Sequence, residues 1–436
     1  MLKSAIGLAA VFITRGIGAV GGVSLSLIIA QLAGADGLGQ FTVFLSFLGI
    51  FAILARRGLD TILIRTVALI EHAGIGGRLP AILRHGAHTA LGGALVLCLP
   101  GAVLLGSGFL GKAIPSAELV FAISLPMVTL LGVIAGYIKG TGRPWLAPLF
   151  EMGGVSLAAT LLIATTLAIG YRLDLVAATI LFACALFALS VCAVLVVAQD
   201  MARRYIPSEP LEPFPKERAE LRQGQLAYTA IALSGFAVQA GSFAIVAPFL
   251  SEEALGLARA AERLALIVSF PILAINPFIA ARVVRHVQSG CDEALWRLIM
   301  KSSLGGAAIA LPVLALLLAA PEIPLIYFGT DFVRAAPYLG ALALAHFLLV
   351  LLGPFPMVMN MGGGEKEMMW VSFVTVAIAV VLYPLAAFWF GVEGFLSAYV
   401  LCSVGRAAIV GALATKLVMA VSKRSGTALR ELDQNG

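Results

Sequence analysis

Arg15 is the residue whose position most strongly indicates chemistry, because it lies half-way along an otherwise apolar run over residues 6–31. A permanent cation inside such a run is costly in a membrane and normally faces a protein interior or a watery cavity. On helical spacing, Ala19, Gly22 and Ser26 share its stripe, and their small side chains leave room beside it. Two roles for Arg15 compete: contact with an anionic substrate, and a structural role in an interhelical ion pair or in snorkelling toward the cytoplasm.

Other polar residues in or beside apolar runs are weaker candidates. Gln239 lies on the polar face of a later run, and Glu151 and Arg406 lie at the start of one run and inside another. His346 is the histidine that falls inside an apolar run, where it could take part in proton coupling. A hydrogen-bonded structural role is favoured for His346, because no acid lies near it in the sequence.

Two motif matches suggest nucleotide chemistry, but their context does not support it. GIGAVG at 16–21 is a formal dinucleotide-binding pattern, yet it follows no strand, and glycines in an apolar helix favour close helix contact. GSGFLGK at 106–112 resembles a phosphate-binding loop, but Ala113 stands where a magnesium-binding Ser or Thr is needed. We therefore expect no cofactor.

The residues that would build an enzyme site or a metal site are dispersed. Acidic residues are scattered over short connections, and the five cysteines occur singly without CxxC spacing. The sequence therefore predicts no catalytic residues, no disulfide framework and no metal site. A membrane-embedded glycosyl transferase or ligase would be expected to show a large loop with paired acids.

The amino-acid composition indicates that most of the chain lies in a membrane. The chain of 436 residues is 61% hydrophobic and only 12% charged, with a mean hydropathy of +1.02. Soluble proteins carry about 25% charged residues. Apolar stretches long enough, or nearly so, to cross a hydrocarbon core of about 30 Å predict an all-α, polytopic membrane protein of about a dozen helices. These stretches are 6–31, 40–55, 87–109, 117–138, 146–169, 175–199, 226–250, 264–281, 302–320, 338–360, 369–390 and 394–420.

Basic residues orient the predicted spans. With the N-terminus placed inside, 22 of the 29 Lys and Arg residues fall in cytoplasmic segments and 5 fall outside, with Arg15 and Arg406 left within spans. This asymmetry predicts a multi-pass protein with both termini in the cytoplasm. It also explains the net charge of +6 by topology and by attraction to membrane lipids, so no nucleic-acid partner is expected.

A proline-rich polar segment divides the spans six and six. We predict an N-terminal lobe at 1–199, a cytoplasmic linker at 200–225, a C-terminal lobe at 226–422 and a cytoplasmic tail at 423–436. Two echoes indicate an internal duplication: GLGQF at 37–41 with LGLAR at 255–259, and GTGRPW at 140–145 with GGGEKE at 362–367. Repeats of this kind enclose a substrate site in several transporter folds.

These turns, the RGLDT segment at 57–61 with Arg65, and the RAAER segment at 259–263 carry a resemblance along the whole chain. The sequence resembles bacterial polysaccharide flippases of the O-antigen and exopolysaccharide type, within the multidrug/oligosaccharidyl-lipid/polysaccharide exporter superfamily. The resemblance implies two six-helix lobes around a central cleft. It also implies a lipid-linked oligosaccharide substrate, carried on undecaprenyl diphosphate and moved to the outer leaflet by alternating access.

A diphosphate needs cationic partners, and arginine offers planar, persistent charge to phosphate oxygens. We expect Arg15 to guide it, with Arg57 or Arg65 at the cytoplasmic mouth and Arg263 near the outer mouth. Polysaccharide polymerase machinery is an expected partner. The main rival of similar fold is a cation-coupled multidrug exporter, which would be expected to carry acidic residues deep in its spans; a lipid II flippase and a purely structural membrane partner are further alternatives.

Overall fold

The computed structural model describes residues 2–72, 76–108, 114–204, 222, 225–288, 292–361 and 363–434. These residues are almost entirely helical, and none of them lies in a strand. Helices are expected in lipid, because each helix satisfies its own backbone hydrogen bonds. The predicted all-α class is confirmed.

Seven of the described helices are long and apolar enough to cross a membrane, by length and composition. Two of them are longer than one crossing requires: α1 (Leu2–Arg56) has an apolar part of 44 residues, about 65 Å, and α16 (Glu365–Gln434) has one of 54 residues. Each is broken by a glycine with positive φ, Gly34 at 68° and Gly391 at 62°. Each long helix therefore covers two predicted spans.

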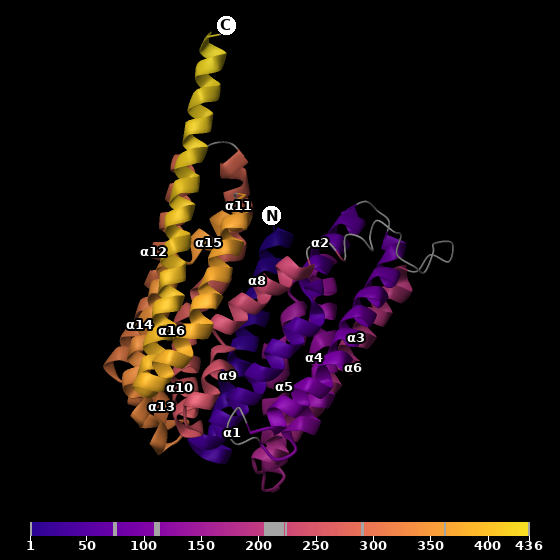
Figure 1. Ribbon diagram of the computed structural model, residues 1–436. Coiled ribbons are helices and arrows are strands. Elements are labelled where there is room, and N and C mark those ends of the chain that lie inside the picture. The colour runs from indigo at the N-terminus through magenta and orange to yellow at the C-terminus, as the bar shows by residue number, and fades with distance from the viewer. Residues whose placement is uncertain are drawn as a thin grey trace. The chain divides into compact units, whose positions relative to one another are not determined.

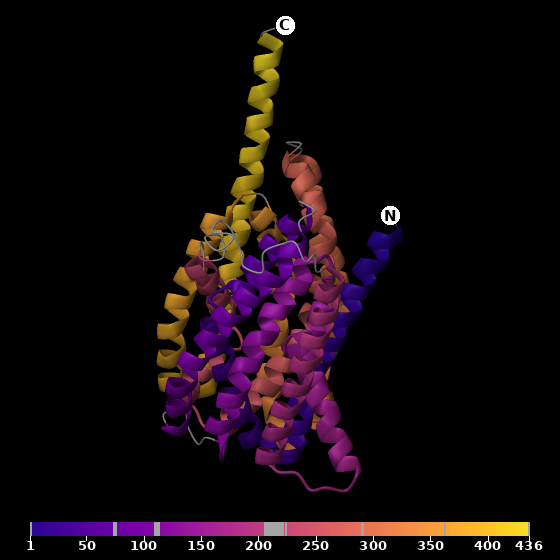
Figure 2. The same cartoon turned by 90° about the vertical axis from the view of Figure 1, so that its right-hand side faces the viewer.

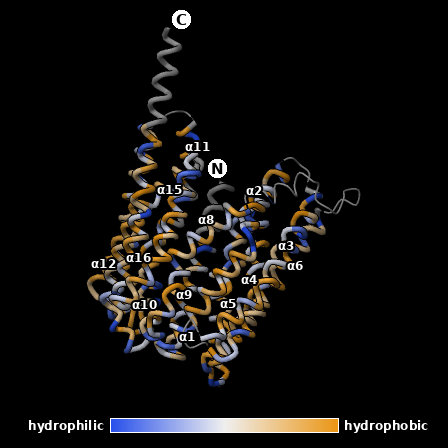
Figure 3. The backbone as a smooth tube through the Cα atoms, in the orientation of Figure 1, coloured by the Kyte–Doolittle hydropathy of each residue, from blue (hydrophilic) through white to orange (hydrophobic). Residues whose placement is uncertain are grey.

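Five further helices of this apolar set each cover one predicted span. They are α3 (Leu79–Gly106), α4 (Ala117–Gly140), α6 (Leu175–Arg204), α12 (Asp292–Ala319) and α14 (Ala336–Leu352), the last continued by α15 (Pro354–Met361). Hydrophobic residues predominate along α3, α4 and α6 (Figure 3).

Three predicted spans take less regular forms. The span at 226–250 is a pair of helices, α8 (Gln225–Val238) and α9 (Ser242–Val246), and it bends by 65° at its break. The span at 146–169 is α5 (Met152–Ala168), which is shorter, and the span at 264–281 falls on η4 (Leu266–Ser269) and α11 (Phe270–Gln288). Every predicted span thus has a helical counterpart.

Contacts group the chain into two compact units. Unit 1 holds residues 1–260 with 327–332, and unit 2 holds residues 261–326 with 333–436. The predicted lobes at 1–199 and 226–422 remain a prediction, and most of the predicted linker, residues 205–221 and 223–224, lies outside the described residues. The predicted tail is a continuation of α16 as far as Gln434.

Unit 1 is a helix bundle in which α1 packs on α3, α4 and α5, and α4 also packs on α2 (Leu59–His72) and α6. Both views show α3, α4 and α6 side by side (Figure 1 and Figure 2). Glycines allow α1 and α5 to lie close together: a Cβ atom on Gly153 of α5 would lie 2.6 Å from the Cα atom of Gly18 in α1. The expectation that the early glycines serve helix contact is confirmed for Gly18.

Within unit 1, each of the echoing segments at 37–41 and 255–259 contacts a residue that shortly precedes the other segment. A Cβ atom on Gly39 would lie 1.9 Å from the carbonyl oxygen of Glu252, and a Cβ atom on Gly256 would lie 1.9 Å from that of Ala35. Gly256 lies 217 positions after Gly39, and Glu252 lies 217 positions after Ala35. The two contacts are therefore equivalent, with the two segments exchanged. A reciprocal contact of this kind is what a twofold-related repeat produces.

Unit 2 is held by an apolar core that joins α11, α12, α15 and α16. The other helices among the described residues are α10 (Glu252–Ala265), α13 (Glu322–Ile326) and the short 3-10 turns η1 (Gly76–Arg78), η2 (Ala147–Phe150), η3 (Ala247–Phe249) and η5 (Thr330–Ala335). The core consists of Ile279, Val283, Leu295, Ile299, Phe355, Val358, Met359, Val410, Ala414 and Val418.

Candidate anion-binding site

Arg15 is half-buried in α1, next to the surface on which α1 packs against α5. Hydroxyl side chains of α1 bond to its own backbone: the Thr14 hydroxyl donates to the Ala10 carbonyl at 2.9 Å, and the Ser26 hydroxyl donates to the Gly22 carbonyl at 3.0 Å. Within the described part of the chain, no carboxylate lies within salt-bridge distance of Arg15. The described residues therefore give no support to an ion-pair role for Arg15.

Glu151, the acidic residue predicted as a weak coupling candidate, is engaged by a lysine. The Nζ atom of Lys139, at the end of α4, lies 2.6 Å from Oε1 of Glu151, which precedes α5. Their side chains are 31% and 40% exposed, so the pair is at the edge of the bundle. The pairing neutralises the carboxylate that a cation-binding role would require.

Asp200 is a second engaged acid, and the sequence did not single it out. Its side chain is 9% exposed; Oδ1 lies 3.2 Å from Nη1 of Arg143, and Oδ2 accepts a hydrogen bond of 3.0 Å from the Tyr137 hydroxyl. This network ties the end of α4 and the connection after it to the end of α6. Buried acids of this kind are retained where cations and donors satisfy them.

Arg57 lies at the junction between α1 and α2, Arg65 lies within α2, and both are exposed. Arg57 has a φ of 51°, and Gly58, with a φ of 71°, follows it and packs against Tyr228. The neighbouring Arg56 lies 3.6 Å from Asp60.

Gln239 lies at the bend between α8 and α9. Its side chain is exposed, while its backbone carbonyl accepts the Ser242 hydroxyl and amide at 2.5 Å and 3.1 Å. The residue therefore shapes the break of this span through its backbone and leaves its amide side chain available.

In unit 2, His346 of α14 is 2% exposed, and its Nδ1 atom lies 2.7 Å from the Ser269 hydroxyl. The fold also brings Glu262 of α10, 3% exposed, close enough for an electrostatic interaction with His346. The sequence offered no acid near His346, because the two residues are far apart along the chain. Arg263 of α10 and Arg406 of α16 are half-buried.

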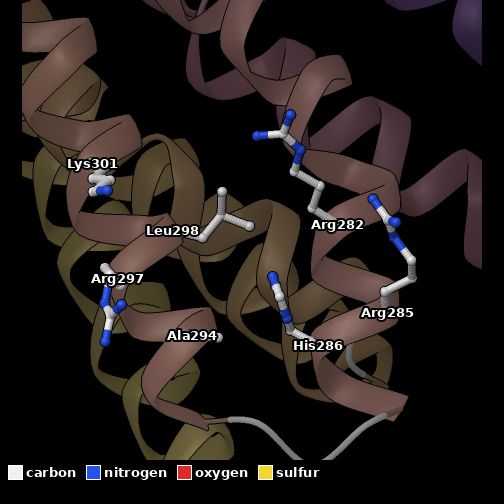
Figure 4. A pocket seen from close by; sticks show the side chains of 7 residues that line it. All are labelled: Arg282, Arg285, His286, Ala294, Arg297, Leu298 and Lys301. Atoms are coloured by element: carbon white, nitrogen blue, oxygen red, sulfur yellow. The ribbon is translucent and has the colours of Figure 1, made fainter. Parts of the chain in front are cut away.

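A basic pocket of about 820 Å³ lies where α11 ends and α12 begins. Figure 4 shows its cationic side chains on both helices: Arg282, Arg285 and His286 from α11, and Arg297 and Lys301 from α12. Ala294 and Leu298 also line the pocket, and none of the described lining residues is acidic. Such a cavity suits an anion, since arginine and lysine donate charged hydrogen bonds to phosphate or carboxylate oxygens.

In the sequence these residues stand out only as charges predicted to be cytoplasmic, and nothing there places them around one pocket. Arg282 and Arg285 lie one turn apart, and so do Arg297 and Lys301, on either side of a short connection. A short connection between two helices makes them antiparallel neighbours, which brings both pairs together. That spacing is the signal that could have predicted the site.

No family model and no curated protein matches this chain. Similarity appears instead in solved structures of MATE family multidrug resistance transporters of the MOP superfamily. The inward-facing conformation of one has a TM-score of 0.75 at 14% identity, covering 96% of this chain and 99% of that one. An outward-facing conformation has a TM-score of 0.64, also at 14% identity, with 96% of each chain covered.

A third similar structure is a MOP superfamily transporter from Pyrococcus furiosus, described as having a binding pocket of reverse polarity that suggests a different function. Its TM-score is 0.62 at 14% identity, and 95% of each chain is covered. These similarities extend over almost the whole chain. The protein therefore has the fold of MOP-superfamily transporters.

Proposed function

We propose that this protein is a flippase that moves an undecaprenyl-diphosphate-linked oligosaccharide across the cytoplasmic membrane by alternating access. The fold supports transport, because the structures that share it are transporters. The charge pattern supports an anionic cargo, because a diphosphate requires cationic partners along its path.

One observation carries the proposal: Arg15 lies inside an apolar helix with no described carboxylate in salt-bridge range. A buried cation is costly unless an anion compensates it. A passing diphosphate would compensate Arg15 during the transport cycle, and water in a cavity would do so between cycles. Arginine suits this task, since it stays charged at every physiological pH and can hold two phosphate oxygens at once.

The other arginines take peripheral roles in this proposal. Arg57 and Arg65, both exposed, would receive the diphosphate at the cytoplasmic mouth, and Arg263 would release it near the outer mouth. Gln239, with an exposed amide beside the break of its span, would contact the sugar portion through hydrogen bonds. The proposed location is the bacterial inner membrane, with both termini cytoplasmic and polysaccharide polymerase machinery as a partner.

A cation-coupled multidrug exporter is the second candidate, and the names of the similar structures favour it equally. A cationic drug or a coupling cation requires an available carboxylate within the spans. In unit 1, two acids next to apolar segments are engaged, Glu151 by Lys139 and Asp200 by Arg143. The similar structure with a pocket of reverse polarity indicates that this fold also accepts a different charge pattern.

Deletion of the gene separates the two candidates. The flippase predicts that lipid-linked oligosaccharide accumulates on the cytoplasmic leaflet and that surface glycan is lost. Hypersensitivity to cationic drugs with unchanged glycan would favour the multidrug exporter and reject the flippase. Complementation with the intact gene is the control for both measurements.

A further inference from the structure

The basic pocket between α11 and α12 lies in unit 2, and the proposed passage of the diphosphate does not use it. Its lining brings four arginine or lysine side chains and a histidine around one open cavity. Arg285 and His286 lie in the last turn of α11, where the negative end of the helix dipole stabilises cations. The pocket is therefore a concentrated positive site at the end of two adjacent helices.

Part of this charge has no partner in the described protein. No described carboxylate lies within salt-bridge distance of Arg285 or Lys301. Arg297 pairs with Glu293 at 2.5 Å, but both side chains are largely exposed, at 63% and 83%. An exposed pair of this kind is weak, so Arg297 can still donate to an incoming anion.

An apolar stripe leads away from the pocket along α12. Arg297, Lys301, Leu304, Ala308 and Leu311 follow one another at spacings of three and four residues, so they share one helix face. All five are exposed, with Leu304 at 66% and Leu311 at 53%. The face thus begins with two cations at the pocket and continues as an apolar surface in a helix able to span a membrane.

We propose that the basic pocket binds the phosphate of an anionic membrane phospholipid, whose acyl chain lies along the stripe on α12. Charge selects the headgroup, because basic pockets at the ends of spanning helices attract anionic headgroups. The stripe selects a lipid over a soluble phosphate, since its apolar face can pack an acyl chain that a free anion lacks. This site is independent of the proposed cargo.

Trp296 provides a direct probe, because it lies next to Arg297 and is 40% exposed, with its ring near Phe355. The chain has four tryptophans, and a variant in which Trp145, Trp370 and Trp389 are phenylalanine reports on Trp296 alone. The purified full chain is titrated with brominated phosphatidylglycerol or brominated phosphatidylcholine, and quenching of its fluorescence is recorded. The site predicts saturable quenching by phosphatidylglycerol at far lower concentrations than by phosphatidylcholine.

The double variant Arg285→Gln with Lys301→Gln should weaken phosphatidylglycerol binding by about tenfold to thirtyfold. Lys301→Gln alone should weaken it about fivefold, and it serves if the double variant does not fold. The matched control is Lys366→Gln with Lys416→Gln, which removes two exposed lysines elsewhere in unit 2 and should change binding less than about twofold.

Three results would overturn the proposal. Equal quenching by both lipids would show that the pocket does not select charge. Displacement of phosphatidylglycerol by millimolar inorganic phosphate would make it a site for a soluble anion. Displacement by a polyprenyl diphosphate at much lower concentrations than by phosphatidylglycerol would assign it to the transported substrate.

Discussion

Lys139 and Glu151 approach to 2.6 Å, and this ion pair joins the end of α4 to the start of α5. Glu151 is thereby paired with a cation of its own chain, which bears on what the protein can carry. Glu151 already has a lysine beside it, whereas Arg15 in the neighbouring helix has no described carboxylate partner.

Glu151→Gln should leave glycan export within about twofold of the native protein. The pair is 31% and 40% exposed, so its loss should cost at most about 1 kcal/mol of stability. The measurement is surface glycan in a deletion strain that expresses the variant, normalised to the amount of protein in the membrane. Loss of export at a normal protein level would assign Glu151 a direct part in transport and favour cation coupling.

Asp200→Asn should destabilise the protein by about 1–3 kcal/mol, because it removes the charge that Arg143 pairs with at a nearly buried position. The melting temperature of the detergent-purified protein reports the loss. Tyr137→Phe removes a hydroxyl that donates to Asp200 and keeps the charge pair, so its effect should be smaller. A double-mutant cycle with both changes should give a non-additive result, and simple additivity would show that the two side chains do not act together.

Gly39→Ala and Gly256→Ala should each lower stability by about 1–3 kcal/mol, because the added Cβ atom would meet a backbone carbonyl oxygen that cannot move alone. Gly235→Ala is the matched control: it lies in α8 with no atom within 4 Å of the added Cβ, and alanine favours a helix. Thermal unfolding of the three variants checks the prediction. A melting temperature for Gly39→Ala equal to that of the control would contradict a close contact between Gly39 and the carbonyl of Glu252.

Hydropathy predicted the helical class, and each predicted span has a helical counterpart, because an apolar run of sufficient length has few other structures available in lipid. It did not predict how the spans are built. Gly34 and Gly391 interrupt α1 and α16, and Gln239 lies at a bend of 65°. The hydrophobic pattern did not predict these breaks, because the backbone conformation of a single residue depends on tertiary packing.

The sequence alone could identify a candidate residue where a charge in an apolar run has a high free-energy cost in the membrane, as it does for Arg15. The sequence could not predict which residues these candidates contact, because the contacts depend on which helices become neighbours in the fold. Glu262 interacts with His346, and Arg285 shares a pocket with Lys301, only after the chain has folded. Sequence spacing indicates faces of one helix, whereas sites usually join several.

Substitution of Arg15 tests the central claim most directly. Arg15→Ala and Arg15→Lys are expressed in the deletion strain at the native protein level, and lipid-linked oligosaccharide is measured in each leaflet together with surface glycan. The proposal predicts at least about a tenfold loss of export for alanine, with accumulation on the cytoplasmic leaflet, and partial recovery for lysine, which keeps the charge without the planar fork. Normal export by Arg15→Ala at a normal protein level would contradict the proposed role of Arg15 in carrying the diphosphate.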